Sequence, residues 1–195
     1  MTNIMFDLET LGVNTDAMIL TIAAVVFDPL TGEIGEIFYS KVDIDSYMPH
    51  SNSFTMDSST LTWWMTTASE SARKEAFGGN RQPLKNVLEN LVSWLSNKYK
   101  IKPWSHGSCF DVSILSYTFK KFNIPSPWKF WDIRDTRTLY EVAGINLKTL
   151  APTAISFQYP EHHAVGDCLR QINGVKISND ILAELRSRPV KMQKI

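Results

Sequence analysis

The run MILTIAAVVFD, Met18–Asp28, constrains the fold most, because it is rich in β-branched residues and has no helical period. It predicts a buried strand. The same signals predict a strand before it at Asn3–Asp7 and another after it at Ile34–Val42. Between the last two, Pro29 and Gly32 supply backbone angles that a tight turn requires. The chain is therefore expected to begin with a meander of three antiparallel strands.

The remainder of the chain alternates predicted helices with predicted strands, after a polar loop at Asp43–Thr55. The first is a short helix capped by Asp57 or Ser58, and the second is an amphipathic helix built on Leu84, Val87, Leu88, Leu91 and Leu95, with Pro83 in its first turn. Two predicted strands, Pro103–His106 and Trp128–Ile133, lie on either side of a predicted helix at Val112–Phe122. The last two predicted helices are Thr136–Ala143, ended by Gly144, and a helix from about His163 to Ile172. This order predicts an α/β fold with a mixed central sheet flanked by helices.

The size and composition of the chain predict a single domain spanning residues 1–195. This length is enough for one sizeable core and short for two. Hydrophobic residues make up 44% and charged residues 21%, which argues against the disordered and collagen-like classes. No apolar run reaches the length of a bilayer span, and the N-terminus lacks the pattern of a signal peptide. A cytoplasmic protein with no membrane contact is expected.

Charge and cysteine content set further limits. The 20 basic and 20 acidic residues cancel, so any contact with nucleic acid has to be local. Cys109 and Cys168 are too few for a disulfide framework, and we expect both to be reduced and structural. The basic stretch Arg186–Lys194 predicts a solvated tail, with contact to a phosphate backbone as the alternative.

Two carboxylates in the segment FDLET suggest a metal site. On a strand, Asp7 and Glu9 point to one face while Phe6 and Leu8 pack on the other. Carboxylates held this close repel and raise each other's pKa unless a cation lies between them. Hard oxygen ligands suit Mg²⁺ or Mn²⁺. The alternative is that both acids face solvent at the end of a half-exposed strand.

Two further stretches carry residues of the same chemical type. Asp111, in SHGSCFDVSIL, follows a predicted strand and starts a predicted helix, where the helix dipole alone favours an acid. In HHAVGDCLRQ, His162 lies on the loop that leads into the last predicted helix and Asp167 lies on that helix. An imidazole there can reach over a metal held by the aspartate. An ordinary helix start with histidines in its first turn explains the same pattern.

Taken together, these three stretches resemble the DEDD exonucleases, in the subgroup with a histidine in an H-x-A-x-x-D pattern. FDLET resembles the first motif, Phe110-Asp111 the second, and His162-x-Ala164-x-x-Asp167 the third, and the resemblance runs from residue 4 to about 172. The segments ILTIAAVVFD, STLTWWM, WSHGSCFD and PWKFWDIRDTRTL resemble a branch of phage and bacterial 3′-5′ exonucleases, some described as exoribonucleases. The resemblance implies a ribonuclease H-like fold and a 3′-5′ exonuclease.

The resemblance also implies roles for single residues. Asp7 would bridge two Mg²⁺ ions, for which Mn²⁺ can substitute, and Glu9 and Asp167 would complete the shell of the first ion. Asp111 would hold the second ion. His162 would act as the general base that takes a proton from the attacking water, and the products would be nucleoside 5′-monophosphates.

One position near these motifs departs from the family pattern, and another has an alternative explanation. His106 stands where the branch often has asparagine, which puts the local hydrogen bonding in doubt but not the metal ligands. Asp135 lies at a position that the family often fills with aspartate, and a cap for the helix at Thr136 explains it equally well.

The resemblance implies that the substrate is the 3′ end of single-stranded DNA or RNA. The neutral overall charge fits an enzyme that grips a few nucleotides rather than a long duplex, since a short grip neutralises few phosphates. By resemblance, Thr10 and Leu11 would touch the terminal nucleotide, and Trp64 or Trp63 would stack on a base. The alternative for both tryptophans is core packing. Many relatives form homodimers, and the sequence shows no interface that decides this point. Two other functions remain open: a metal-dependent phosphoesterase acting on small nucleotides, and a catalytically idle nucleic-acid-binding module.

Overall fold

A central sheet of six strands organises the computed structural model, which describes residues 1–146 and 158–187. The strand order is β4-β3-β2-β1-β5-β6. The strands run over β1 Thr2–Thr10, β2 Ile19–Phe27, β3 Ile34–Asp43, β4 Gln82–Pro83, β5 Ile101–Ser105 and β6 Arg134–Asp135. β1, β2 and β3 pair in antiparallel order, whereas β5 is parallel to β1 and β6 is parallel to β5. The predicted meander and mixed sheet are confirmed.

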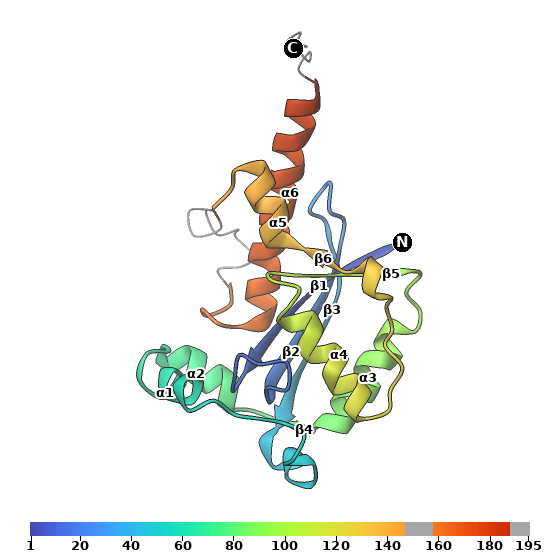
Figure 1. Cartoon of the computed structure of the whole chain (residues 1–195). Helices are drawn as coiled ribbons and strands as arrows, with labels where there is room; N and C mark the ends of the chain where they lie inside the picture. Colours follow the sequence, from blue (N-terminus) through green and yellow to red (C-terminus); the bar gives the residue numbers. More distant parts are fainter. Residues whose placement is uncertain (147–157, 188–195) are drawn as a thin grey trace, which may run out of the picture.

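Helices cover both faces of this sheet (Figure 1). They are α1 Ser58–Thr66, α2 Glu70–Phe77, α3 Leu84–Leu95, α4 Asp111–Lys121, α5 Thr136–Ala143 and α6 Ala164–Ser187, with two 3₁₀ helices, η1 Ile44–His50 and η2 Phe130–Asp132. α3 and α4 pack on the face that carries Phe6, and α6 packs on the face that carries Met5. Because alternate side chains of a strand point to opposite faces, the sheet contributes to two separate apolar layers.

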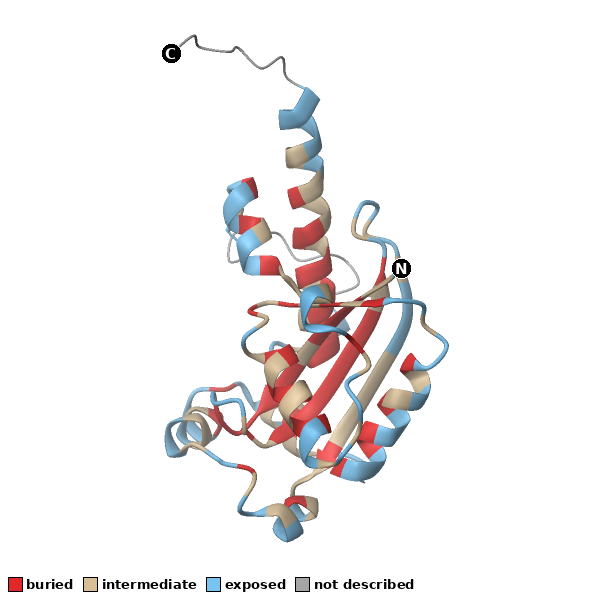
Figure 2. Cartoon of the chain, turned by 45° about the vertical axis from the view of Figure 1, so that its right-hand side comes forward, coloured by how far each residue is buried: buried red, intermediate tan, exposed pale blue. Residues whose placement is uncertain are grey.

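The burial pattern follows these layers (Figure 2). β2 is buried along almost its whole length because it lies inside the sheet and is covered on both faces. α1 and α2 enclose a third, smaller apolar cluster with Leu11, Leu20 and Trp64 at one end of the sheet. The C-terminal turns of α6 extend past the body of the protein and are exposed.

Several predicted elements need correction. The strand predicted at Trp128–Ile133 is wrong, because Trp128 packs into the core while Phe130 and Trp131 are exposed on η2. Only the two residues of β6 reach β5. The loop predicted at Asp43–Thr55 contains η1, whose Tyr47 is buried and hydrogen-bonds the backbone of Ile19.

Other differences concern helix ends and cysteines. α2 was not predicted, and α6 runs to Ser187 instead of ending near Ile172. The basic tail predicted from Arg186 therefore begins as helix, and the part beyond Ser187 lies outside the described residues. Cys168 is buried and Cys109 is exposed, so a structural role is wrong for Cys109.

The helix ends at Asp57 and Gly144 follow the predictions in position. Asp57 lies at the N-cap of α1, but its carboxylate accepts a hydrogen bond from the Val13 backbone N–H at 2.9 Å instead of capping the helix. Gly144 ends α5 in the left-handed conformation, with φ of 71°, as its position predicted.

Candidate active site

Strand β1 places two carboxylates on one face of the sheet. Asp7 is paired with Ala23 of β2 and Glu9 with Thr21, so both acids point toward the face covered by α6. Asp7 is partly buried and Glu9 is 8% exposed. The arrangement expected from FDLET is therefore present, and neither acid lies on a freely solvated strand end.

A third carboxylate reaches this region from α4. Asp111 is the first residue of that helix and is 3% exposed. Its Oδ1 accepts a hydrogen bond from the backbone N–H of Leu8 at 3.1 Å. This bond ties the start of α4 to the residue between Asp7 and Glu9, so the second and first sequence motifs meet through a backbone contact.

The start of α6 supplies the last two predicted residues. Asp167 lies in the first turn of the helix, and exposed His162 lies two residues before the helix begins. Nitrogen or oxygen atoms of Glu9, His162 and Asp167 all lie within 4.8 Å of one another. The third sequence motif therefore faces the first across the junction between α6 and the sheet.

All five predicted residues line one pocket of about 390 Å³. Its lining consists of Asp7, Leu8, Glu9, His106, Phe110, Asp111, His162, Asp167, Arg170 and Gln171. A volume of this size falls in the range of pockets that hold small ligands.

Two of these lining residues were missed by the sequence reasoning. Gln171 Nε2 donates a hydrogen bond to Asp7 Oδ1 at 2.7 Å. The Arg170 guanidinium donates to Asp167 Oδ1, with its Nε at 3.1 Å. Their spacing of three and four residues from Asp167 places them on one side of the same helix, which is the signal that points to them.

The electrostatics of the pocket are dominated by repulsion among carboxylates. Burial raises the pKa of Asp7 well above its usual value, and the charges of Asp167 and Asp111 raise it further. Burial raises the pKa of Glu9 in the same way. Burial also raises the pKa of Asp111 to about 7, although the hydrogen bond from Leu8 opposes this. Concentrated negative charge of this kind favours a bound cation.

The donor atoms fit hard divalent cations. Four carboxylates and two imidazoles, those of His106 and His162, line the pocket, and no cysteine does so among the described residues. Carboxylate oxygens suit Mg²⁺ and Mn²⁺, whereas soft metals favour thiolates. The pocket can therefore hold cations next to an anionic ligand and place a histidine at its rim.

The residues predicted to touch substrate lie beside the pocket rather than in its lining. Thr10, Leu11 and Trp64 are 6%, 2% and 2% exposed. Trp64 Nε1 donates to the backbone oxygen of Thr10 at 2.9 Å. This geometry favours packing over base stacking for Trp64 in this conformation, and substrate contact by these residues stays a prediction. Trp63 is less buried and meets the His162 ring edge-on, with centroids 4.8 Å apart.

His106 and Asp135 organise the loop between β5 and α4. His106 lines the pocket, and its Nδ1 hydrogen-bonds Thr136 Oγ1 at 2.9 Å. Asp135 caps α5 through the backbone N–H of Arg137 and also accepts from the Ser108 N–H at 2.5 Å. The Asp135 carboxylate thus both caps α5 and anchors the loop.

Comparison with known proteins shows that this chain is similar to nucleases. Residues 2–178 match the family model described as the 3′-5′ exoribonuclease Rv2179c-like domain. The chain is 26% identical over 201 aligned positions to the exodeoxyribonuclease of Enterobacteria phage T4, covering 88% of this chain and 86% of that protein.

Solved structures share the fold. A complex of E. coli exonuclease I with a dT13 oligonucleotide aligns with a TM-score of 0.61 at 16% identity, over 95% of this chain and 42% of that chain. A full-length 3′-exonuclease aligns with a TM-score of 0.52 at 12% identity, over 94% of this chain and 82% of that chain. The chain thus spans less than half the length of exonuclease I. Within the described residues, no helix is long and apolar enough to cross a membrane.

Proposed function

The chain belongs to the 3′-5′ exoribonuclease Rv2179c-like domain family and is a 3′-5′ exonuclease of the DEDD superfamily, and from this premise we propose that it uses two divalent ions to shorten single-stranded nucleic acid. Each step would release a nucleoside 5′-monophosphate from the 3′ end. One observation carries this proposal: Asp7, Glu9, Asp111, Asp167 and His162, distant in sequence, line the same pocket.

The four carboxylates are the proposed ligands of the ions. Asp7 would contribute to both ions, Glu9 and Asp167 to the first and Asp111 to the second. Magnesium is the proposed ion and manganese a substitute, because the ligands are hard oxygens. Bound there, divalent ions would neutralise charge that develops on the scissile phosphate and increase the acidity of the attacking water.

His162 is the proposed general base. It is exposed at the rim of the pocket, with a ring nitrogen within 4.8 Å of ligand oxygens from Glu9 and Asp167. A neutral imidazole can take a proton from a water molecule aligned with the phosphodiester. Gln171 and Arg170 would keep the carboxylates of Asp7 and Asp167 in orientation through their hydrogen bonds.

The proposed substrate is a single strand held at its 3′ end. The pocket volume of about 390 Å³ falls in the range of sites that hold small ligands, and exonuclease I, which shares the fold, was solved in complex with ssDNA. The family model describes an exoribonuclease and the phage relative is an exodeoxyribonuclease, so the preferred sugar is a question for experiment. A homodimer stays a prediction.

The test is digestion of 5′-labelled single-stranded RNA and DNA. With Mg²⁺ we expect a ladder that shortens from the 3′ end and 5′-monophosphate products, and no cleavage after chelation with EDTA. Restoring Mg²⁺ should restore cleavage. Asp7→Asn should lower the rate by about 10³-fold or more, since it removes a shared ligand of the ions.

Two controls separate this function from its alternatives. A 3′-phosphorylated oligonucleotide reports whether a free 3′ end is needed. A small phosphate ester of a mononucleotide reports on the phosphoesterase alternative. Unchanged shortening by Asp7→Asn, or hydrolysis of the ester with no shortening of oligonucleotides, would refute the proposal.

A further inference from the structure

Two adjacent histidines at the start of α6 have different surroundings. His162 is exposed at the pocket, whereas His163 is buried, with 8% of its surface exposed. The backbone of His162 has φ of +56°, a left-handed conformation that is uncommon for a residue other than glycine. Such a conformation persists only where the surrounding structure holds it. The contacts of the next residue, His163, can hold this conformation.

His163 is fixed by contacts on both ring nitrogens and by two neighbouring aromatic rings. Its Nδ1 accepts a hydrogen bond from the Val165 backbone N–H at 3.2 Å, which caps α6. Because Nδ1 accepts, the proton of the neutral ring is on Nε2, which lies 3.5 Å from Glu75 Oε1. The ring also stacks on Tyr39, with centroids 4.8 Å apart, and contacts Tyr159 at 4.6 Å.

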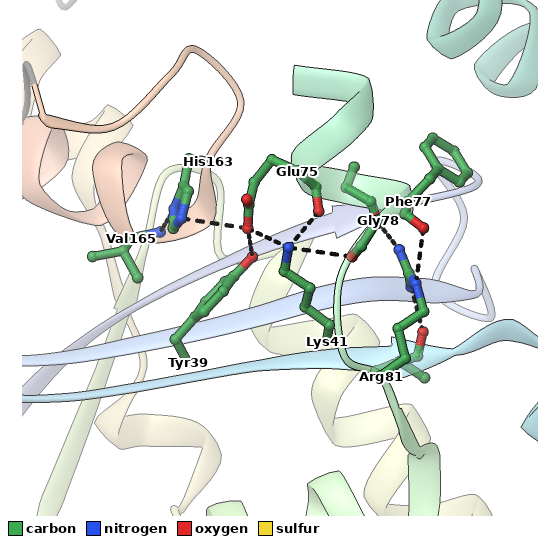
Figure 3. Close-up of polar contacts among 10 residues, drawn as sticks. Tyr39, Lys41, Glu75, Phe77, Gly78, Arg81, His163 and Val165 are labelled. Atoms are coloured by element: carbon green, nitrogen blue, oxygen red, sulfur yellow. Dashed lines mark hydrogen bonds and ion pairs between the residues drawn. The ribbon is translucent and has the colours of Figure 1, made fainter. Parts of the chain in front are cut away.

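Glu75 is the centre of this cluster (Figure 3). Its Oε1 accepts a hydrogen bond from the Tyr39 hydroxyl at 2.6 Å and lies 2.7 Å from Lys41 Nζ. Burial alone would raise the pKa of Glu75, but the hydrogen bonds from Lys41 and Tyr39 hold it below its usual value. The carboxylate is therefore charged at neutral pH and connects α2, β3 and the start of α6.

The cluster is in register with the proposed metal ligands. Tyr39 of β3 pairs with Ala23 of β2, which pairs with Asp7 of β1. Lys41 pairs with Thr21, which pairs with Glu9. Two strand spacings, or about 10 Å, separate each of these residues from its carboxylate. A contact network on the sheet thus stands beside the pocket at the level of the acids.

We propose that Glu75, held by Tyr39 and Lys41, is a positioning residue for His162. It fixes His163, and His163 fixes the backbone from which the preceding imidazole projects over the pocket. The inference rests on the proposed function, because it assumes that His162 is the general base. Helix α1 contributes from the other side, through the edge of Trp63 against the His162 ring.

The cluster can be altered without releasing α2 from the sheet. Arg81 donates hydrogen bonds to the backbone oxygens of Phe77 and Val42 at 3.1 Å and 2.6 Å, and it does not contact His163 (Figure 3). Lys41 also donates to the backbone oxygen of Glu75 at 2.8 Å. These contacts remain when the Glu75 carboxylate is changed.

Three variants break the contact at different points. Glu75→Gln removes the charge, Tyr39→Phe removes one hydroxyl, and His163→Asn keeps a helix-capping side chain while losing the reach to Glu75. Glu36→Gln is the matched control, because Glu36 lies on β3 and, like Glu75, pairs with a lysine, here Lys98 at 2.8 Å, but it does not line the pocket.

The experiment measures steady-state cleavage of an oligonucleotide by the full chain, with and without His162→Ala. We expect Glu75→Gln and His163→Asn each to lower kcat about tenfold with KM changed less than about twofold. In the His162→Ala background we expect no further loss, because residues that act through one group are not additive. Glu36→Gln should leave both constants unchanged.

The outcomes are distinguishable. If the wild type does not shorten oligonucleotides, or if His162→Ala is fully active, the proposed function or its general base fails. If the wild type is active and His162→Ala is impaired, equal losses from Glu75→Gln in both backgrounds would show a merely structural contact and overturn the inference. Normal kcat in both Glu75→Gln and His163→Asn would overturn it as well. Should Glu75→Gln not fold, Tyr39→Phe and His163→Asn carry the same comparison.

Discussion

At the scale of single residues, the carboxylates of the pocket repel one another, and bound cations would reduce this repulsion. Asp7, Glu9 and Asp111 all have raised pKa values because they are withdrawn from water near one another. Keeping these acids together for the proposed function therefore lowers the stability of the folded protein. The fold has to hold these acids together without help from a cation until one binds.

The first prediction concerns the pH dependence of stability in the presence of EDTA. Burial raises the pKa of Asp111 from its usual value of 3.8 to about 7 in the folded state, so between these values the folded state binds more protons than the unfolded state. Stability should therefore fall as pH rises through this window, by up to about 1.4 kcal/mol per pKa unit. Thermal unfolding at pH 5.5 and pH 8 measures this.

Asp111→Asn provides the control for that measurement. It removes the titrating group, so the dependence should become shallower, and Mg²⁺ should raise stability at pH 8 more than at pH 5.5. A wild-type protein that gains stability from pH 5.5 to pH 8 in EDTA would contradict this account of the pocket.

The second prediction concerns Gln171, which donates to Asp7. Gln171→Leu keeps most of the side-chain volume but removes the hydrogen bond that orients the carboxylate. Contacts of this kind typically change metal affinity or activity by about 10–100-fold. We expect the Mg²⁺ concentration for half-maximal activity to rise by a similar factor. Titration calorimetry with Mn²⁺ gives a readout independent of turnover, and unchanged affinity for the ion would contradict the assignment.

At the scale of elements, close approach of α5 and α6 depends on one glycine. A Cβ at Gly174 would lie 2.5 Å from the Tyr140 hydroxyl oxygen. That hydroxyl cannot turn away freely, because it donates to the backbone oxygen of Gln171 at 2.6 Å and the ring is buried. Gly174 therefore sets how closely α5 and α6 approach each other, next to residues that line the pocket.

The third prediction follows from this contact. Gly174→Ala should lower the free energy of unfolding by about 1–3 kcal/mol, as overpacking in a core does, despite the better helix propensity of alanine. Chemical denaturation measures the change. Asn173→Ala, one residue earlier on the same helix, is the control and should be nearly neutral. Equal stability of both variants would show that α5 can shift at no cost.

The elements that sequence reasoning found and missed differ in how local their signals are. The meander, α3 and α5 were predicted because their periodicity and turn residues lie within each segment. α2 was missed because its ESARKEAF sequence is mostly polar, and only Ala72 and Ala76 are buried. At Trp128–Ile133, aromatic residues suggested a strand, but exposure of Phe130 and Trp131 depends on tertiary packing.

The same distinction applies to the pocket. Asp7, Glu9, Asp111, His162 and Asp167 were identified because they belong to short motifs in a fixed order. The contacts of Glu75 and His163 join segments that are far apart in the chain, and neither residue has a local signature. Such contacts become visible only when the three-dimensional arrangement is known.

At the scale of the whole molecule, the body of the fold ends before α6 does. Val175 and Ser178 are fully buried, whereas the residues from Ala183 to Ser187 are exposed. The family match also ends at residue 178. The final turns of the helix are thus separable from the pocket.

The fourth prediction is that a chain ending at Leu182 keeps its stability within about 0.5–1 kcal/mol, because the described residues that it lacks, 183–187, are exposed. Its exonuclease activity should match that of the full chain. A chain ending at Asn173 loses Val175 and Ser178 from the core and should not fold cooperatively. Circular dichroism and thermal unfolding check both, and a large loss of stability in the longer truncated chain would contradict the prediction.

Asp167 lies on α6, the last helix of the fold, and completes a set of acids whose first members are in β1. Because these acids come from the first strand and the last helix, the pocket is complete only when nearly the whole described chain has folded.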